Sequence, residues 1–243
     1  MISKLKCAYF WTMCVVVTIS LIVVSTCIQA FIVLFRLPRT GRPSHRINTL
    51  WGRTIIKLMP GWKVSVYDEH NVPPGEVVVI VANHESMSDI CAIYHLDVQF
   101  RWLSKEEVFK IWGVGAAMRS AGYVSIRRGV LQSHAQAMLE SAERLRGGAS
   151  MFYFPEGTRA SEEGIKPFKS GAFKLARDEK VRILPVAIHG ARDLLPKGRA
   201  TPGKAHVKIK VLPPLPPPGL GDDLDAFAEK VRQDIIKVHQ TLV

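Results

Sequence analysis

The spacing of apolar and polar positions after residue 62 predicts a domain in which strands and helices follow one another. Apolar runs predict strands at residues 63–67, 77–82, 100–103, 123–126, 150–154, 182–188 and 206–211, the last a half-exposed edge strand. Apolar residues at helical spacing predict helices at 86–96, 105–118, 132–146, 173–180 and, after a cap at Asp222 or Asp223, 224–242. This alternation favours an α/β fold with layers of sheet and helix.

A long uncharged segment precedes this domain. From Cys7 to Phe35, 29 residues carry no charged side chain, and about 20 helical residues suffice to cross a bilayer. Lys4 and Lys6 precede the segment, and Arg36, Arg39, Arg42 and Arg46 follow it. The positive-inside tendency therefore places the rest of the chain in the cytoplasm, at the inner membrane if the source is bacterial. A cleaved signal peptide is the alternative, but the run is long for one and lacks a clear small-x-small site.

A second apolar pattern, from Ser44 to Trp62, predicts an amphipathic helix that ends at Pro60-Gly61. Its apolar positions are Ile47, Leu50, Trp51, Ile55 and Leu58, with basic residues around the rest of the wheel. Such a helix suits the headgroup region of a membrane, and packing on the domain core is an equally good interpretation. We therefore predict a membrane-associated two-helix module at residues 1–62 and an α/β domain at residues 63–243.

The charge narrows the range of partners. The formal net charge is +12 and the isoelectric point is about 9.7. Basic chains attract nucleic acid, anionic lipid headgroups or phosphorylated substrates. The long apolar segment favours lipid, and nothing except charge indicates nucleic acid. Four cysteines without a CxxC pair suggest neither a zinc ribbon nor a disulfide framework, and we expect no metal and no cofactor.

The first group of residues with chemical potential follows the apolar run 77–82 directly. Its sequence is Asn83-His84-Glu85-Ser86-Met87-Ser88-Asp89. Ligands of α/β sheets bind beyond the carboxyl ends of strands, and a histidine there can act as a general base. Asp89 can reach back to one imidazole nitrogen, as the aspartate of a Ser-His-Asp triad does. A structural histidine is the alternative, whereas the metalloprotease zinc motif would need a second histidine in place of Ser88.

The second group follows the run 150–154. Pro155 and Gly157 shape a loop, in which Glu156 can accept hydrogen bonds from a substrate hydroxyl or from the backbone. Arg159 can bind a phosphate through two parallel hydrogen bonds. The alternative is a surface turn with an ion pair between Glu156 and Arg159.

The third group is basic. Lys105 follows one predicted strand, and Arg127-Arg128 follows another. If both strands end at the same edge of the sheet, these cations converge and can bind a phosphate dianion. A solvated basic surface is the alternative.

Together these groups resemble the motifs of the glycerolipid acyltransferase family, in particular its 1-acyl-sn-glycerol-3-phosphate acyltransferases of the PlsC type. The segment from Asn83-His84 to Asp89 is similar to the NHxxxxD motif, and Phe154-Pro155-Glu156-Gly157-Thr158-Arg159 is similar to the FPEGTR motif. Lys105, Gly122 and Arg127-Arg128 resemble the basic second motif, and residues 184–188 resemble the apolar fourth. Order and spacing match from about residue 62 to residue 190.

The resemblance implies a mixed sheet flanked by helices and a direct transfer without an acyl-enzyme. A fatty acyl chain would pass from acyl-CoA or acyl carrier protein to the sn-2 hydroxyl of lysophosphatidate, giving phosphatidate. His84 would deprotonate the hydroxyl, oriented by Asp89, and Glu156 would position the glycerol backbone. The implied substrate-binding residues are Lys105, Arg127, Arg128, Glu156, Gly157, Thr158 and Arg159, with Pro185 bordering the acyl or thioester site.

Several alternatives remain at this stage. The acceptor could be glycerol 3-phosphate or another lysolipid, although an FPEGTR motif without a second glycine favours lysophosphatidate. A membrane-bound binding protein without activity and a thioesterase-like hydrolase are the other classes. Both acyl donors are compatible with the sequence, and so are a first helix that spans the bilayer and one that enters a single leaflet.

Overall fold

The computed structural model describes residues 2–38, 40–160, 164–195 and 201–243, so Arg39 lies outside the described residues. The strands of these ranges are β1 (Trp62–Tyr67), β2 (Val78–Ala82), β3 (Phe100–Lys105), β4 (Val124–Ile126), β5 (Ser150–Tyr153), β6 (Arg182–His189) and β7 (Ala205–Val211). The helices are α1 (Ile2–Leu34), α2 (Arg42–Leu58), α3 (Asp89–Ile93), α4 (Glu106–Phe109), α5 (Val114–Ser120), α6 (Leu131–Arg146), α7 (Gly171–Asp178), α8 (Ala191–Leu194) and α9 (Leu224–Thr241), with a 3-10 turn at Glu69–Asn71. The predicted α/β alternation is confirmed.

The strands form one mixed sheet, seven-stranded within the described ranges, in the order β1-β7-β6-β2-β5-β3-β4. Strands β6, β2, β5, β3 and β4 run parallel, whereas β7 is antiparallel to β6 and pairs in parallel with β1. The prediction of β7 as an edge strand is therefore wrong. Its alternation arises because Val207 and Ile209 face the core, while Lys208 on the other face donates to the Leu242 carbonyl of the last turn.

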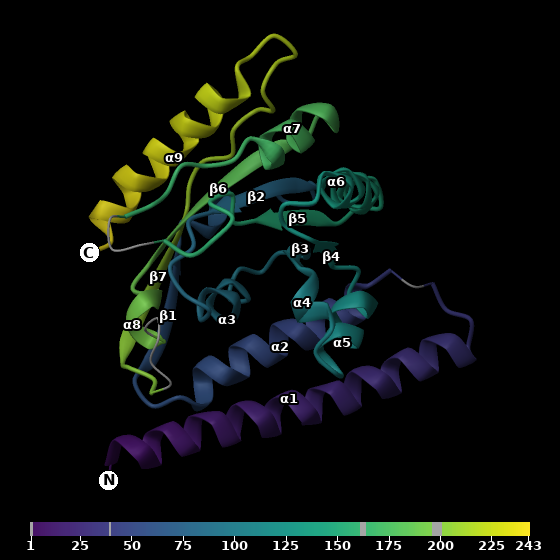
Figure 1. Cartoon of the computed structure of the whole chain (residues 1–243), viewed down its shortest axis with the longest axis vertical. Helices are drawn as coiled ribbons and strands as arrows, with labels where there is room; N and C mark the ends of the chain where they lie inside the picture. Colours follow the sequence, from purple (N-terminus) through teal and green to yellow (C-terminus); the bar gives the residue numbers. More distant parts are fainter. Residues whose placement is uncertain (1, 39, 161–163, 196–200) are drawn as a thin grey trace.

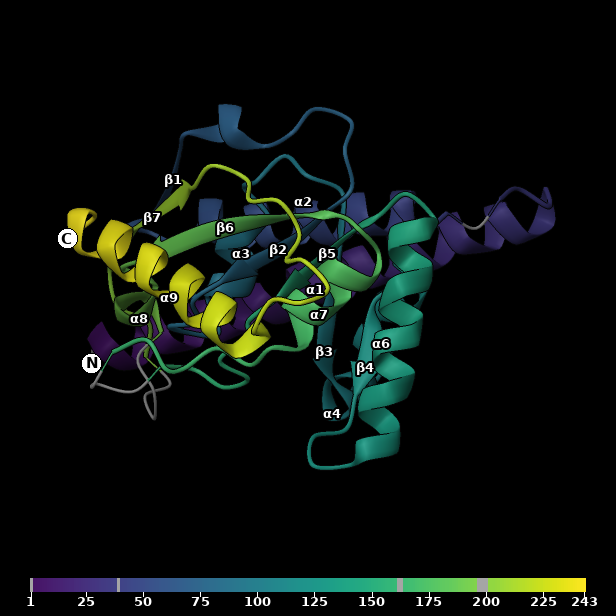
Figure 2. The same cartoon turned by 90° about the horizontal axis from the view of Figure 1, so that it is seen from above.

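Helices cover both faces of the sheet (Figure 1). Helices α6, α7 and α9 lie on one face, and α2, α3, α4 and α5 lie on the other with α1 outside them; Figure 2 shows the same layers from above. Each face has its own core, because successive strand residues point to opposite sides. Within β2, Ile80 belongs to the core that also contains Phe10 and Met118, whereas Val79 and Val81 belong to the core that contains Phe173.

The predicted helix at residues 105–118 is wrong, because the chain breaks there into α4 and α5. Gly113 takes φ +72° and ψ −49°, which only glycine adopts easily. The N–H of Val114 donates to the carbonyl of Trp112 at 2.8 Å and closes a γ-turn. Gly115 lets the backbone fold back closely, since a β-carbon there would lie 1.9 Å from the Phe109 carbonyl oxygen. The result is a tight corner rather than one helix.

Helix α2 is enclosed between α1 and the domain. It begins at Arg42 and ends at Leu58, so it is displaced from the predicted range of 44–62 because Trp62 already belongs to β1. Ile47, Ile55 and Ile56 are buried, which makes packing on the core the better interpretation of its pattern. On its other side α2 packs against α1, which is the longer of the two helices and has the length and apolar composition of a bilayer-crossing helix.

Candidate active site

The parallel part of the sheet gathers the predicted residues at one edge. Because β2, β5, β3 and β4 are parallel neighbours, all four carboxyl ends lie on the same side. His84 follows β2, the loop 154–160 follows β5, Lys105 ends β3 and Arg127 follows β4. Neighbouring strands are about 4.8 Å apart, so the end of β3 lies about 10 Å across the sheet from that of β2.

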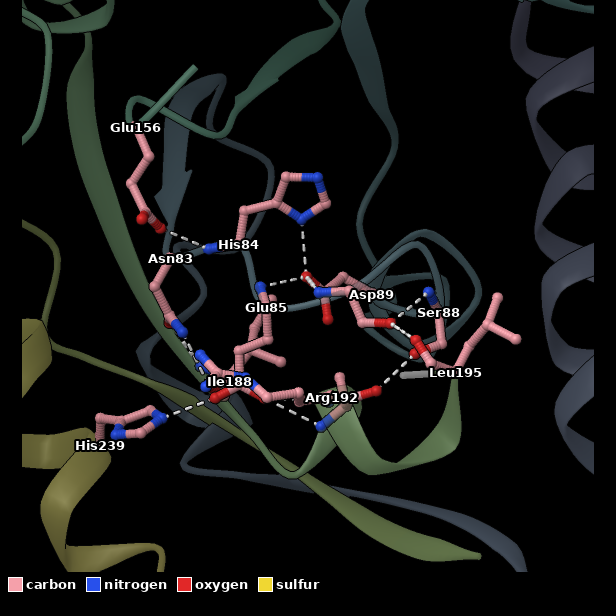
Figure 3. Close-up of polar contacts among 12 residues, drawn as sticks. Asn83, His84, Glu85, Ser88, Asp89, Glu156, Ile188, Arg192, Leu195 and His239 are labelled. Carbon is pink, nitrogen blue, oxygen red and sulfur yellow. Dashed lines mark hydrogen bonds and ion pairs between the residues drawn. The ribbon is translucent and has the colours of Figure 1, made fainter. Parts of the chain in front are cut away.

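His84 and Asp89 form a direct pair (Figure 3). The imidazole Nδ1 lies 2.7 Å from Asp89 Oδ2, the same oxygen that accepts the N–H groups of Glu85 and Ser86 at 2.7 and 2.9 Å. These bonds hold residues 84–86 in a turn, so α3 starts only at Asp89 and the predicted helix 86–96 is shorter than expected. The His84 ring stacks on Phe154, with centroids 4.0 Å apart, and its Nε2 points away from Asp89.

Asp89 is the buried member of the pair. Burial raises the pKa of its carboxyl group, and the hydrogen bond and charge of His84 oppose that rise. Its Oδ2 accepts two backbone N–H groups, which favours the ionised carboxylate, and the other oxygen, Oδ1, is buried without a partner in the described part of the chain. A carboxylate in this position favours the imidazole tautomer with its proton on Nδ1, as in the Ser-His-Asp triad.

Glu156 holds the backbone of His84 rather than facing open space. Its Oε1 accepts the N–H of His84 at 2.7 Å, and its Oε2 accepts the N–H of Lys166 at 2.9 Å. The loop after β5 also donates the N–H of Ala160 to the His84 carbonyl at 2.6 Å. Both carboxylate oxygens thus bind backbone groups, one of the two uses predicted for this residue. Burial raises the pKa of the Glu156 carboxyl group.

The rest of the loop 157–159 carries less buried groups. Gly157 has φ +70°, Thr158 is exposed, and Arg159 is half-buried without an ion pair among the described residues. Sequence reasoning missed Lys169, whose Nζ would lie 3.1 Å from a β-carbon at Gly157. Its backbone N–H donates to the Pro155 carbonyl, so the residue is tied to this loop. The basic run Lys166-Pro167-Phe168-Lys169 after the FPEGTR-like motif is the signal that could have indicated it.

Of the basic residues at the ends of β3 and β4, only some are free to bind a phosphate. Lys105 is exposed and pairs in register with Ile126, next to Arg127. Arg127 Nε lies 2.6 Å from Glu106 Oε2, and this hydrogen bond lowers the pKa of the Glu106 carboxyl group to about 2. Arg128 is exposed. The cations therefore share an edge, but the charge of Arg127 is already matched.

The side chain of Glu85, next to His84, connects its own loop with two segments that are distant in the sequence, at Ala191 and at His239. Its Oε2 accepts the N–H of Ala191, and its Oε1 lies 2.7 Å from Nε2 of His239 in α9. That nitrogen lies 3.3 Å from His189 Nδ1. Within the described ranges, Glu85, His189 and His239 are the one group close enough to hold a metal ion, and here they form a hydrogen-bonded chain that excludes His84. Sequence analysis did not indicate this link.

Pro185, the proline of the apolar segment 184–188, lies inside the sheet. It is buried in β6 opposite Val81 of β2, and its carbonyl accepts the N–H of Leu212. Asn83, the first residue of the NHxxxxD-like segment, connects the same two strands, since its side chain both donates to and accepts from Ile188 at 2.8 Å. These contacts fix the end of β2 from which His84 emerges.

Comparisons with known proteins agree with this arrangement. The Acyltransferase family model matches residues 63–189. The 1-acyl-sn-glycerol-3-phosphate acyltransferase alpha of Homo sapiens is 32% identical over 77% of this chain and 67% of its own length. A Chlamydomonas reinhardtii enzyme of the same description is 30% identical over 88% of this chain. The chain spans 54–65% of the length of the algal and plant relatives it matches.

The fold also matches a solved structure. The crystal structure of the 1-acyl-sn-glycerophosphate (LPA) acyltransferase PlsC from Thermotoga maritima superposes with a TM-score of 0.77 at 27% identity. The match covers 99% of this chain and 95% of that one. Because the match covers nearly the whole of both chains, the layered sheet and the two N-terminal helices fall within the superposition.

Proposed function

Because this chain belongs to the acyltransferase family, we propose that it transfers a fatty acyl chain from acyl-CoA or acyl carrier protein to the sn-2 hydroxyl of lysophosphatidate, giving phosphatidate. The observation that carries the proposal is the 2.7 Å pair of His84 and Asp89, with the second ring nitrogen turned away from the carboxylate. The names of the relatives and of the solved structure support lysophosphatidate as the acceptor.

The chemistry follows from the protonation of the pair. With the proton on Nδ1 held by Asp89, Nε2 of His84 takes the proton of the acceptor hydroxyl. The oxygen attacks the thioester carbonyl carbon, the carbon–sulfur bond breaks, and the leaving thiolate takes a proton from the imidazolium. No residue of the chain is acylated, and no cofactor is needed. Phe154 and Glu156 keep the ring and the backbone of His84 in place for this transfer.

Cations at the same edge are proposed to bind the phosphate of the acceptor. Lys105 and Arg159 suit this role because neither forms an ion pair within the described residues. Lys169 lies over the same loop as Arg159 and adds a third positive charge. Arg127 and Arg128 would support them, Arg127 only after exchanging Glu106 for the phosphate. Gly157 and Thr158 complete the loop beside the acceptor.

The N-terminal module is proposed to lie in one leaflet of a membrane, with the catalytic domain on the cytoplasmic side. Tyr9 binds the Leu58 carbonyl, and Gln29 binds Ser44, so α1 is fastened to α2 near both of its ends. An α1 that crossed the bilayer upright would carry α2, with Arg46 and Arg53, into the hydrocarbon. A helix in the plane of the interface avoids this cost and leaves its apolar face to lipid.

An acceptor panel tests the proposal. Purified protein in vesicles receives labelled acyl-CoA or acyl carrier protein together with lysophosphatidate, glycerol 3-phosphate, another lysophospholipid or no acceptor. We expect phosphatidate as the main product. Free fatty acid without acceptor would indicate a hydrolase, and a better acceptor than lysophosphatidate would overturn the substrate assignment. We expect His84→Ala to lose at least a thousandfold in rate with unchanged folding, and a rate near that of the wild type would remove His84 from the chemistry.

A further inference from the structure

The corner between α4 and α5 presents two large apolar side chains to the surroundings. Ile111 is 54% exposed and Trp112 is 85% exposed. Neither residue belongs to the site described above or to a motif. A tryptophan with an apolar body and one N–H group suits the boundary between lipid and water, where such rings concentrate.

Backbone contacts hold the corner in shape, so the exposure of these side chains is built into the fold. The N–H of Ile111 donates to the Val108 carbonyl, and the N–H of Gly115 donates to the Ile111 carbonyl at 2.9 Å. The guanidinium of Arg119 donates to the Phe109 carbonyl at 2.9 Å and fastens α5 to α4. The γ-turn at Gly113 lies between them and directs the chain outward at Trp112.

The same corner rests on the middle of α1. A β-carbon on Gly113 would lie 2.6 Å from Cδ1 of Ile22, so the turn is in contact with that helix. Figure 1 shows α4 and α5 on the α1 side of the sheet. The outward face of α1 carries exposed apolar residues such as Val15, Ile19 and Val23. The corner therefore extends this face sideways.

The corner also lies close to the proposed phosphate site. Lys105 ends β3 and immediately precedes α4, so only five residues separate it from Ile111. Lys110 lies next to the apolar pair with a side chain that is 65% exposed. Its ammonium group lies 3.4 Å from Glu106, a surface ion pair that an anionic headgroup can replace. Whatever surface binds Ile111 and Trp112 is therefore held near the end of β3.

We propose that Ile111 and Trp112 form a second lipid contact, which enters the headgroup layer of the membrane beside α1. The occupant of this surface is the bilayer itself, because the corner is continuous with the apolar face of α1. The contact holds the carboxyl end of β3 against the surface from which a lipid acceptor enters. This last step rests on the proposed function, whereas the insertion of the corner does not.

Fluorescence quenching tests the insertion without any need for activity. The full chain is bound to vesicles of phosphatidylcholine and phosphatidylglycerol, with or without 6,7-dibrominated chains, and the emission of Trp112 is obtained by subtracting that of the Trp112→Phe variant. We expect the brominated lipid to reduce this component at least twofold and the vesicles to protect it from aqueous iodide. A component that stays bright in brominated vesicles and is quenched by iodide would overturn the proposal.

Kinetics test the consequence for the acceptor. In Ile111→Ser/Trp112→Ser, the mole fraction of long-chain lysophosphatidate that gives half-maximal rate should rise about tenfold, since two large apolar side chains lose their lipid contact. The double variant should acylate a short-chain acceptor, dissolved as monomers, at the same rate as the wild type. Leu220→Ser is the matched control, because Leu220 is 91% exposed in the turn before α9, on the other face of the sheet. Equal effects with both acceptors, or an equal effect in the control, would contradict the proposal.

The quenching experiment and the kinetic experiment together separate this inference from the proposed function. If the wild-type chain acylates no lysophosphatidate, the substrate assignment fails, while the quenching result still decides whether the corner inserts. If transfer is found and Trp112 stays in water, the corner has no lipid contact and the function stands.

Discussion

Replacing Glu156 by glutamine separates a residue that positions His84 from one that binds substrate. In the structure both carboxylate oxygens accept backbone N–H groups, one from His84 and one from Lys166. Glutamine keeps one oxygen and presents its NH₂ group to the second N–H. One of the two buried bonds must therefore break, and the loop after β5 moves away from His84 or from Lys166.

The size of the effect follows from these contacts. A hydrogen bond to a charged group contributes about 1.5–3 kcal/mol, and the buried N–H left without a partner costs about 1–3 kcal/mol. Burial already raises the pKa of Glu156, so a neutral side chain regains part of this loss. We expect Glu156→Gln to lower the free energy of unfolding by about 2–3 kcal/mol. A displacement of His84 of about 1 Å should lower kcat by about 10- to 100-fold.

Steady-state kinetics with lysophosphatidate in mixed micelles, together with urea unfolding, measure both effects. A positioning role predicts a lower kcat with a KM for the acceptor that changes by less than about threefold. Glu179→Gln is the control, because it removes a carboxylate that pairs with Arg146 away from the site. A raised KM with an intact kcat would refute this reasoning and return Glu156 to the acceptor glycerol, as the family resemblance implies.

Two further predictions concern charged groups outside the pair. Burial lowers the pKa of His45 to about 3, so between that pH and the unfolded pKa of about 6.5 only the unfolded chain binds the proton. The free energy of unfolding should therefore fall by about 2 kcal/mol from pH 7 to pH 5. Urea titrations of the His45→Gln variant should lack this dependence on pH. The Glu106→Gln substitution removes the carboxylate that pairs with Arg127 and should lower the KM for lysophosphatidate two- to fivefold. Adding Arg127→Ala to the same chain should cancel this effect. An unchanged KM in Glu106→Gln would exclude Arg127 from the phosphate site.

The pairing of His84 with Asp89 was predictable because its signals are local. A buried strand followed within five residues by a histidine and an aspartate places both groups at one strand end. The convergence of Lys105 and Arg127 was predictable from the strands before them, once those strands were taken as parallel neighbours. The pairing of Arg127 with Glu106 was not, because a sequence shows which charges exist but not which of them meet.

The missed features depend on long-range contacts. The Glu85–His239 contact joins positions 154 residues apart, and the alternation in β7 is the same whether its neighbour is solvent or β1. The break at Gly113 had a local signal in Gly113-Val114-Gly115, but the apolar spacing on either side of it favoured one helix.

The pairing of β1 with β7 sets an order of events during synthesis. Trp62 lies opposite Ala205, and β1 is the outer strand of the described sheet, so its backbone has no strand partner until β7, at residues 205–211, has left the ribosome. The apolar helix α1 emerges long before that point. Membrane capture can therefore precede closure of the sheet, and the nascent chain would complete its catalytic domain while already tethered to the lipid surface.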